Sequence, residues 1–323
     1  MQIAITGATG FIGRRLVQHY ENEGAVVHIL SRKALPNTNA RTRVYNLDLA
    51  SCKSEDLVSF VDGCDILYHC AAELRDANKM VQVNEEGTKK LFHAAKGRVG
   101  RWVQLSSVGV YGRPRLGLVD ESCVTDPQNI YEKSKLAADE WLTNESSGAS
   151  TALTIVRPST VFAHDMTNQS LFQLAKRIQR GQFIYIGSRQ AQMNYVHADN
   201  VLAALVLCGQ QAKAIGQTYI VSDHMMIGEF VDVLADHLKC ARPRLVVPEV
   251  MARALTALFG WIPGFPLTPS RIDAMTNKCI YSDAHIRKQL GFVSQLTLEK
   301  GLSQFADHCS SIQSKTAEPS KTL

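Results

Sequence analysis

Apolar residues in the first half of the chain alternate between short continuous runs and runs with helical spacing. Six short runs are mostly apolar, as strands buried on both faces should be, and they span residues 2–6, 25–30, 43–47, 65–70, 101–106 and 152–157. Between them, residues 11–23 and 84–96 repeat apolar side chains every three or four positions, which predicts amphipathic helices. This alternation is typical of an α/β fold with a doubly wound parallel sheet.

After Pro158 the alternation loosens, and longer helical patterns follow at 169–180, 198–209, 228–239, 250–259 and 297–308. We therefore predict a first domain over 1–160, to which some later segments return. A smaller C-terminal α/β lobe that binds the substrate is expected over 161–310, and a flexible tail over 311–323, where Ser, Lys and Thr predominate.

The most apolar segment of the second half, residues 250–265, is too short to cross a bilayer as a helix and contains Arg253. We interpret it as an amphipathic helix that packs within the smaller lobe. The alternatives are a lid over a hydrophobic substrate and an exposed patch that touches lipid.

Three glycines follow the first predicted strand directly, at Gly7, Gly10 and Gly13, with Phe11 and Ile12 between the last two. Residues without a Cβ atom let a strand-to-helix turn approach a pyrophosphate, and the start of the next helix offers free N–H groups and a partial positive charge. The alternative is a glycine-rich turn without a ligand. The strand before the turn and the helix after it favour a dinucleotide site.

The end of the second predicted strand indicates which dinucleotide binds. An acidic residue there would accept hydrogen bonds from the ribose hydroxyls of NAD, but the sequence reads Leu30, Ser31, Arg32, Lys33. The two basic side chains suit the 2′-phosphate of NADP, and a solvated basic loop is the alternative. We expect NADP(H) as the favoured cofactor, with NAD(H) as the second possibility.

Tyr131 and Lys135 are four residues apart at the start of a strongly helical segment, so they lie on one face. A nearby ammonium stabilises a phenolate and lowers the tyrosine pKa from about 10, which makes the tyrosine a usable acid or base near neutral pH. Such a pair is also common as a plain surface contact. However, Ser106 and Ser107 end a preceding strand, and the carboxyl ends of parallel strands meet at the edge where the glycine turn lies. These side chains together predict a catalytic site.

Composition and charge indicate which classes of protein and which kinds of partner the chain fits. Of the 323 residues, 45% are hydrophobic and 20% are charged, as in ordinary globular proteins. Lys and Arg outnumber Asp and Glu by 35 to 30 without forming a basic tract, so we expect no nucleic-acid partner. The eight cysteines have no zinc-type spacing, so no metal site is predicted. The N-terminal strand leaves no room for a signal peptide, and we expect a cytoplasmic protein without a transmembrane segment.

The chain resembles the extended short-chain dehydrogenases/reductases, within the NAD-dependent epimerase/dehydratase group, over nearly its whole length. Besides the glycine turn, the resemblance rests on Asp48-Leu49, Cys70-Ala71-Ala72, Asn84 with Gly87-Thr88, Ser106-Ser107 through Val110-Tyr111-Gly112, Asp120-Glu121, Tyr131 with Lys135, Arg157-Pro158, and Tyr195-Val196-His197 with Asp199. It implies a Rossmann-like fold, an oxidoreductase that transfers hydride, and a homodimer formed through the helices after Asn84 and Tyr131.

The resemblance also implies roles for single residues. Tyr131 would be the acid/base, Lys135 would hold the nicotinamide ribose and tune Tyr131, and Ser107 would bind the reacting carbonyl oxygen. Around the cofactor, Asp48 and Leu49 would border the adenine, Ala71 and Ala72 would line the channel, Asn84 would support the site from a neighbouring helix, and Pro158 would lie beside the nicotinamide. His197 and Asp199 are expected to be structural, with His197 capping the next helix or bracing the interface between the lobes.

The implied substrate is a nucleotide diphosphate sugar, as in polysaccharide biosynthesis, and the reaction is 4-keto reduction or C4 epimerisation. Candidate substrate contacts are Ser107, Asn168, Arg177, Asn194 and Arg271. Two departures from the family pattern favour other branches: Met193 replaces an arginine, and an Arg-x-Gly-Asp-type segment is missing near Arg271. The alternatives are a hydroxysteroid or dihydroflavonol-type alcohol dehydrogenase and a non-catalytic NADP-binding regulator.

Overall fold

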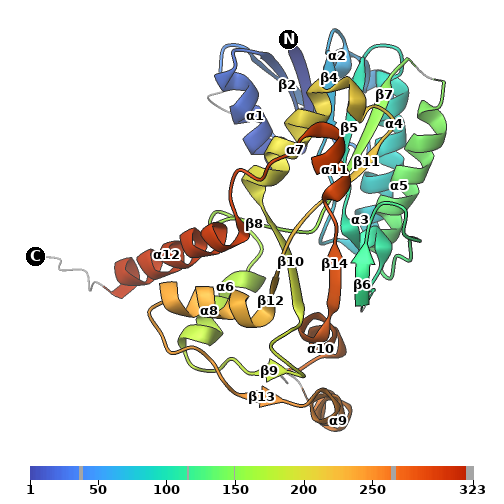
Figure 1. Cartoon of the computed structure of the whole chain (residues 1–323). Helices are drawn as coiled ribbons and strands as arrows, with labels where there is room; N and C mark the ends of the chain where they lie inside the picture. Colours follow the sequence, from blue (N-terminus) through green and yellow to red (C-terminus); the bar gives the residue numbers. More distant parts are fainter. Residues whose placement is uncertain (36–38, 115, 149, 263–266, 318–323) are drawn as a thin grey trace, which may run out of the picture.

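The computed structural model describes residues 1–35, 39–114, 116–148, 150–262 and 267–317, and a seven-stranded parallel sheet forms its centre (Figure 1). The strands are β1 (Gln2–Thr6), β2 (Val26–Ser31), β3 (Thr42–Asn46), β4 (Ile66–His69), β5 (Arg101–Leu105), β7 (Ala152–Pro158) and β11 (Thr218–Val221). Their order across the sheet is β11-β7-β5-β4-β1-β2-β3. The six predicted strands are present, and the predicted doubly wound, Rossmann-like sheet is confirmed. The strand order reverses between β1 and β4, which is where ligands bind in such sheets.

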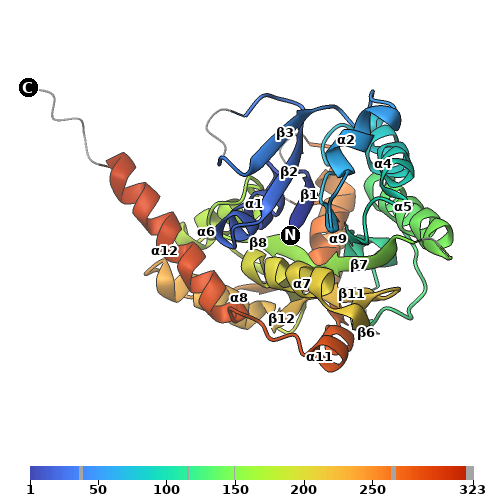
Figure 2. The same cartoon turned by 90° about the horizontal axis from the view of Figure 1, so that it is seen from above.

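Helices cover both faces of the sheet, as the view from above shows (Figure 2). On one face, α1 (Gly13–Asn22) packs on β1 and β2, α7 (Ala198–Gln210) packs on β4, β5 and β7, and α11 (Ala284–Leu290) packs on β11, and their apolar sides share one core with Ile3 and Ile5 of β1. On the other face, α2 (Val58–Val61), α4 (Gly87–Ala95) and α5 (Ile130–Ser146) share a second core with Ala4 and Leu67. Because alternate residues of a strand point to opposite faces, a strand covered on both sides must be apolar throughout.

The second lobe lies below the carboxyl edge of this sheet (Figure 1). It contains a three-stranded sheet of β8 (Thr160–Phe162), β10 (Gln192–His197) and β12 (Asp223–Met226). Its helices α6 (Ser170–Gln179), α8 (Ile227–His237) and α12 (Leu298–Ala317) share a core that includes Phe230 and Phe305. Two small sheets complete it: β9 (Tyr185–Ile186) pairs with β13 (Val246–Val247), and β6 (Leu116–Val119) pairs with β14 (Lys278–Tyr281). The helices α9 (Glu249–Phe259) and α10 (Pro269–Thr276) lie at its far end.

Three segments differ from the sequence-based expectation. β11 is a strand of the central sheet that we did not predict, although the expected return of later segments to the first domain allows for it. The predicted helix 84–96 is divided, because α3 (Ala77–Met80) leads into a π-helical turn, η2 (Val81–Glu86), before α4 begins. The predicted tail 311–323 is helical as far as Ala317, and its remainder, 318–323, lies outside the described residues.

The apolar segment 250–265 does not pack as expected. Its described part forms α9 and the residues up to Ile262, while 263–265 lie outside the described residues. Only Ala252 of α9 is fully buried, and large side chains such as Val250 and Leu258 face outward. The expectation that this helix buries its large apolar residues inside the smaller lobe is therefore wrong.

Candidate active site

The glycine turn between β1 and α1 lies against the end of β4. Gly7 has φ +65°, and a Cβ atom on it would lie 2.7 Å from the backbone nitrogen of Ala71. A Cβ atom on Gly13 would overlap the carbonyl oxygen of Gly7. Both positions therefore require glycine. The resulting close approach of backbone to backbone leaves a cradle at the start of α1 that fits a pyrophosphate.

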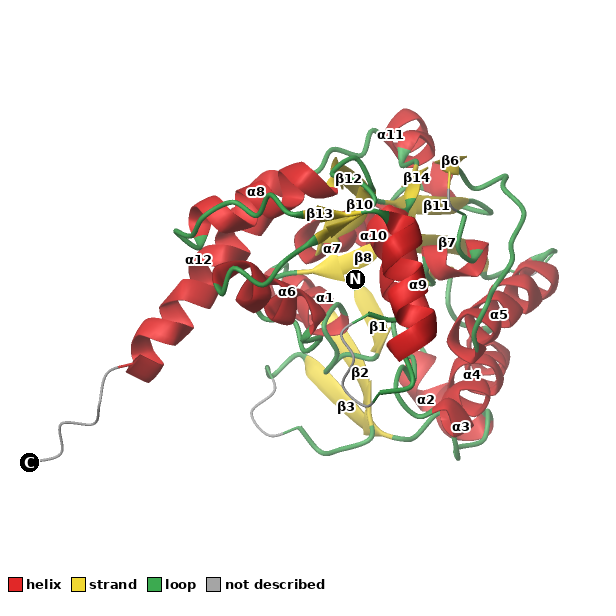
Figure 3. Ribbon diagram, turned by 90° about the horizontal axis from the view of Figure 1, so that it is seen from below, coloured by secondary structure: helices red, strands yellow, loops and turns green. Residues whose placement is uncertain are grey.

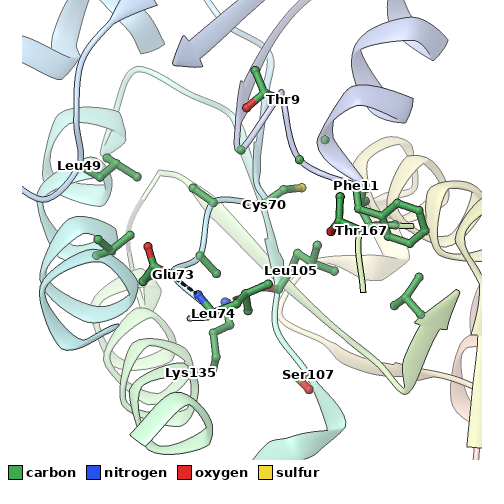
Figure 4. A pocket seen from close by; sticks show the side chains of 18 of the residues that line it. Thr9, Phe11, Leu49, Cys70, Glu73, Leu74, Leu105, Ser107, Lys135 and Thr167 are labelled. Carbon is green, nitrogen blue, oxygen red and sulfur yellow. Dashed lines mark hydrogen bonds between the residues drawn. The ribbon is translucent and has the colours of Figure 1, made fainter. Parts of the chain in front are cut away.

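A cavity of about 470 Å³ lies along the carboxyl edge of the sheet (Figure 4). In this view Thr9 and Phe11 of the glycine turn lie at one end, and Ser107 and Lys135 lie toward the other. The structure brings most predicted site residues together here: Gly7, Gly10, Phe11, Ile12, Gly13, Arg32, Asp48, Leu49, Ala71, Ala72, Ser107, Tyr131, Lys135, Pro158 and Asn168 all line the cavity. Its volume is within the usual range for a small-molecule site.

Arg32 and Asp48 line the part of the cavity beside β2 and β3. A carboxylate that the sequence did not single out, Glu73, lines the same cavity. Its Oε1 accepts hydrogen bonds from the backbone N–H groups of Arg75 and Asp76, at 2.9 and 3.2 Å. These bonds lower the pKa of the Glu73 carboxyl, and the positive charge of Arg32 adds to the effect. The exposed Arg32 guanidinium is thus a cation within electrostatic reach of this end of the cavity.

Tyr131 is placed by a capped helix start. The Asn129 side chain accepts a hydrogen bond from the Glu132 N–H, and the Glu132 carboxylate accepts one from the Gln128 N–H, at 3.0 and 2.7 Å. This reciprocal arrangement is close to a capping box. It begins α5 at Ile130, so Tyr131 lies in the first turn and faces the cavity.

Burial raises the pKa of Tyr131 to about 12, the charges of Asp139 and Glu132 act in the same direction, and a hydrogen bond with the Ser107 side chain lowers it. The sequence predicted that Lys135 would lower this pKa. Instead, the Lys135 ammonium donates a 2.7 Å hydrogen bond to the carbonyl oxygen of Leu105. Ser107, at the end of β5, is therefore the side chain that stabilises the Tyr131 phenolate in this geometry.

Lys135 itself is buried, and burial lowers the pKa of its ammonium, while the charge of Asp139 opposes this shift. Lys135 and Asp139 are one turn apart on the buried side of α5. The negative charge beneath the ammonium helps to keep it protonated within the protein.

A buried polar network lies behind the cavity. The Asp139 carboxylate accepts hydrogen bonds from Ser106 Oγ at 2.6 Å and from Arg157 at 3.1 and 3.2 Å. Arg157 also donates to the Tyr111 hydroxyl at 2.8 Å. The network joins the ends of β5 and β7 to α5, so it fixes the strands that carry Ser107 and Pro158. Asp139 was not predicted from the sequence, although the four-residue spacing of Tyr131, Lys135 and Asp139 was a signal for it.

Asn84 does not line the cavity among the described residues, but it supports one wall. Its amide oxygen accepts a hydrogen bond from the Glu73 N–H at 2.7 Å, and its amide nitrogen donates to the Glu73 carbonyl and to Ser134 Oγ, at 3.1 and 3.0 Å. It therefore links the loop after β4 to α5. The role beside the cofactor that the resemblance implied for Asn84 stays a prediction.

Only two of the five candidate substrate residues, Ser107 and Asn168, are brought together in the described cavity. Asn168 lines the cavity, and its Oδ1 accepts a hydrogen bond from the Ser170 N–H. Arg177 and Arg271 are exposed on α6 and α10, outside the described cavity lining. The Asn194 amide donates to the Cys279 carbonyl and accepts from the Tyr281 N–H, so β14 takes up its polar groups.

His197 acts as expected for a structural residue. Its side chain accepts a hydrogen bond from the Asp199 N–H at 3.3 Å and caps α7. Asp199 forms an ion pair with Arg15 of α1 at 3.4 Å. In the described part of the chain, no group of three or more His, Cys, Asp or Glu residues is arranged to hold a metal ion.

The reversal of strand order, the glycine turn and the cavity define a dinucleotide-binding α/β protein. The sequence model of the NAD dependent epimerase/dehydratase family matches residues 3–222. The chain belongs to this family.

Relatives with different activities align with the chain. It is 29% identical over 260 residues to cinnamoyl-CoA reductase 1 of Arabidopsis thaliana, covering 72% of this chain and 74% of that protein. It is 26% identical over 326 residues to UDP-glucose 4-epimerase of Vibrio cholerae, covering 94% of each. It is 22% identical over 332 residues to 3-beta-hydroxysteroid dehydrogenase of Mycolicibacterium neoaurum, covering 94% of this chain and 90% of that protein.

Solved structures confirm the fold. UDP-glucuronic acid 4-epimerase from Bacillus cereus, in complex with NAD, superposes with a TM-score of 0.75 at 18% identity, covering 97% of this chain and 99% of that chain. At this identity the likeness concerns the fold and does not identify a substrate.

Proposed function

We propose that the protein is a nicotinamide-dependent oxidoreductase that interconverts a secondary alcohol and a ketone, with NADP(H) as the favoured cofactor. The observation that carries the proposal is the single cavity that joins the glycine turn to Ser107, Tyr131 and Lys135. A family that includes alcohol dehydrogenases, reductases and epimerases supports the same general reaction.

Each side chain has a role that its geometry supports. In reduction, the Tyr131 phenol donates the proton to the oxygen of the reacting carbonyl, and the Ser107 hydroxyl holds that oxygen. The nicotinamide supplies or accepts the hydride when bound. Lys135 keeps a positive charge beside the site, and two of its three N–H groups are left for other acceptors because one is used by Leu105.

The cavity favours an apolar substrate of the hydroxysteroid or dihydroflavonol kind. Beyond the catalytic groups, its lining includes Phe11, Leu105, Val161 and Met166. The steroid dehydrogenase and cinnamoyl-CoA reductase relatives support this class. We place an apolar alcohol or ketone first among the substrates.

A nucleotide diphosphate sugar is the second candidate, and the epimerase relative supports it. A diphosphate needs cationic donors. Of the candidate substrate contacts proposed from the sequence, Ser107 and Asn168 line the described cavity, and both side chains are neutral. The third possibility, a non-catalytic NADP-binding regulator, is disfavoured because Tyr131 and Lys135 are both present in the cavity.

The test is a fluorescence titration of the purified protein with NADPH and NADH, followed by absorbance assays of cofactor oxidation and reduction. A 3β-hydroxysteroid, a dihydroflavonol, a 4-keto sugar nucleotide and UDP-glucose are the probes. Net turnover with either of the first two supports the first candidate. Net NADPH oxidation by the keto sugar, or inversion of UDP-glucose without net absorbance change, would support the nucleotide-sugar enzyme. Tight cofactor binding with no reaction on any probe would favour the regulator.

A further inference from the structure

The outward face of α9 carries large apolar side chains. Val250 is 81% exposed and Leu258 is 64% exposed, and just beyond the helix Trp261 is 79% exposed. The same face includes Met251, Leu255, Phe259 and Ile262, all exposed. Leu245 and Val246, which precede the helix, are also exposed. We call these residues the α9 patch. Soluble surfaces seldom gather this many apolar side chains on one helix unless the face is covered.

The buried face of α9 is small and polar by contrast. Ala252 packs against Ile186 and Ile272. Beside it, the half-buried Arg253 donates hydrogen bonds to Glu249 at 2.8 Å and to Asp273 at 2.7 Å. The helix thus makes its protein contacts through an alanine and an ion-pair cluster. This is the reverse of an ordinary surface helix, whose apolar side faces the core.

The segment that carries the patch has more basic than acidic residues, and one of the basic residues, Arg242, is paired with Asp236 just before this segment. Residues 239–278 include six Lys and Arg but only two Asp and Glu. Both acidic residues, Glu249 and Asp273, pair with Arg253. The exposed Arg244 forms no ion pair within the part of the chain that the structure describes, and it directly precedes Leu245. Apolar side chains flanked by basic ones match the surface of a membrane with anionic lipids.

The shape and position of the patch also suit a bilayer. α9 lies at the end of the molecule opposite the N-terminus (Figure 1), and it is a prominent outer helix when the molecule is viewed from that end (Figure 3). A single protruding helix can press into a soft headgroup layer, whereas a protein partner needs a complementary groove. Tryptophan is enriched at membrane interfaces. No described helix is both long and apolar enough to span a membrane.

We propose that the α9 patch docks the protein onto the surface of an anionic lipid bilayer. The helix lies flat in the headgroup region, with its apolar side chains toward the acyl chains and Arg244 toward lipid phosphates. Docking would bring the carboxyl edge of the sheet, where the cavity lies, to the membrane side of the molecule. The idea that docking delivers an apolar alcohol from the membrane to this cavity rests on the proposed function. Docking of the patch to the membrane does not depend on the proposed function.

Trp261 is a built-in reporter, because Trp102 is fully buried and Trp141 is half-buried. The experiment adds vesicles of phosphatidylcholine, with or without phosphatidylglycerol, to the full chain, and measures tryptophan fluorescence and co-sedimentation. We expect binding to the anionic vesicles with a blue shift of the emission, and no such shift in Trp261→Phe.

Leu258→Glu tests the apolar contact, and we expect it to weaken vesicle binding about tenfold or more. Val293→Glu is the matched control, because Val293 is 69% exposed but lies between α11 and α12. The control should bind like the unaltered protein. Arg244→Glu should weaken binding to the anionic vesicles but leave the fold intact.

Three results would overturn the proposal. Vesicle binding that survives Leu258→Glu would mean that basic charge alone attracts the protein. Concentration-dependent dimerisation lost in Leu258→Glu, without vesicle binding, would mean that a second copy covers the patch. A monomer that binds no vesicles would leave the patch uncovered. NADPH titration of each variant separates these results from a failure of the proposed function, because cofactor binding does not involve the patch.

Discussion

The Lys135 ammonium donates a 2.7 Å hydrogen bond to the carbonyl oxygen of Leu105, at the end of β5. The bond joins α5 to the strand that ends next to Ser107, so it holds together the two elements that carry the proposed catalytic hydroxyls. In this structure burial raises the pKa of the Tyr131 phenol and a hydrogen bond with Ser107 lowers it, while Lys135 contributes a buried cation to the wall of the cavity.

Replacement of Tyr131 by phenylalanine tests the proton donor. We expect Tyr131→Phe to lower kcat/KM by about 10²- to 10⁴-fold, the usual contribution of a positioned acid/base. NADPH affinity should change little, since the cradle for the pyrophosphate is at the other end of the cavity. Tyr45→Phe, on β3 and outside the described cavity lining, is the control and should keep full activity. Equal activity of Tyr131→Phe and the unaltered protein would remove Tyr131 from the mechanism.

The raised pKa of Tyr131 predicts opposite pH profiles for the two directions of the reaction. Reduction uses the protonated phenol, so its rate should stay level from about pH 6 to about pH 9. Oxidation uses the phenolate, which is scarce below the pKa of about 12. Its rate should therefore rise about tenfold per pH unit over the same range. An oxidation profile that levels off below about pH 8 would mean that another group is the base.

Arg32 should decide the choice of nicotinamide cofactor. If it binds the 2′-phosphate of NADP, Arg32→Ala loses a charged hydrogen bond of about 1.5–3 kcal/mol. That corresponds to about a 10- to 150-fold rise in KM for NADPH, with KM for NADH nearly unchanged. Lys33→Ala is the neighbouring control, because Lys33 does not belong to the described cavity lining. Equal effects on the two cofactors would contradict this role.

The buried pair of Asp139 and Arg157 should matter more for stability than any exposed pair. Asp139→Ala leaves the Arg157 guanidinium buried without its carboxylate, which typically costs about 3–5 kcal/mol of the free energy of unfolding. Urea denaturation measures the loss. Asp236→Ala, which removes the exposed partner of Arg242, should have a much smaller effect. The double variant Asp139→Leu, Arg157→Met should be more stable than Asp139→Ala; if it is not, the unpaired charge is not the cause.

The sequence predicted the central sheet well because its strands are mostly apolar runs between clear helical patterns. β11 was not predicted because it is a run of only four residues. Nothing in the sequence around it indicates that it pairs with β7, which lies about 60 residues earlier in the chain. The glycine turn and the spacing of Tyr131 and Lys135 are local features, so these residues were found together with the strand that ends in Ser107. These residues lie in one cavity because the carboxyl ends of parallel strands meet at the same edge of the sheet.

Long-range contacts account for the site features that the sequence did not predict. The side chain of Asn194 was a candidate for substrate binding, but its amide is used by hydrogen bonds to Cys279 and from Tyr281 of the neighbouring β14. Glu73 enters the cavity through the loop after β4, where its carboxylate caps three successive N–H groups. The outward face of α9 was also unpredictable, because an apolar helix has the same sequence pattern whether its partner is the core or a membrane.

Transfer of deuterium from NADPH that carries deuterium at both C4 positions of the nicotinamide is the most direct test of the proposed catalytic cavity. It is measured by mass spectrometry of the product after incubation with the ketone that gives turnover, for the unaltered protein and Tyr131→Phe. We predict one deuterium on the carbinol carbon of the product, formed much more slowly by Tyr131→Phe. Product without deuterium, or labelled product formed equally fast by both proteins, would contradict hydride transfer assisted by Tyr131.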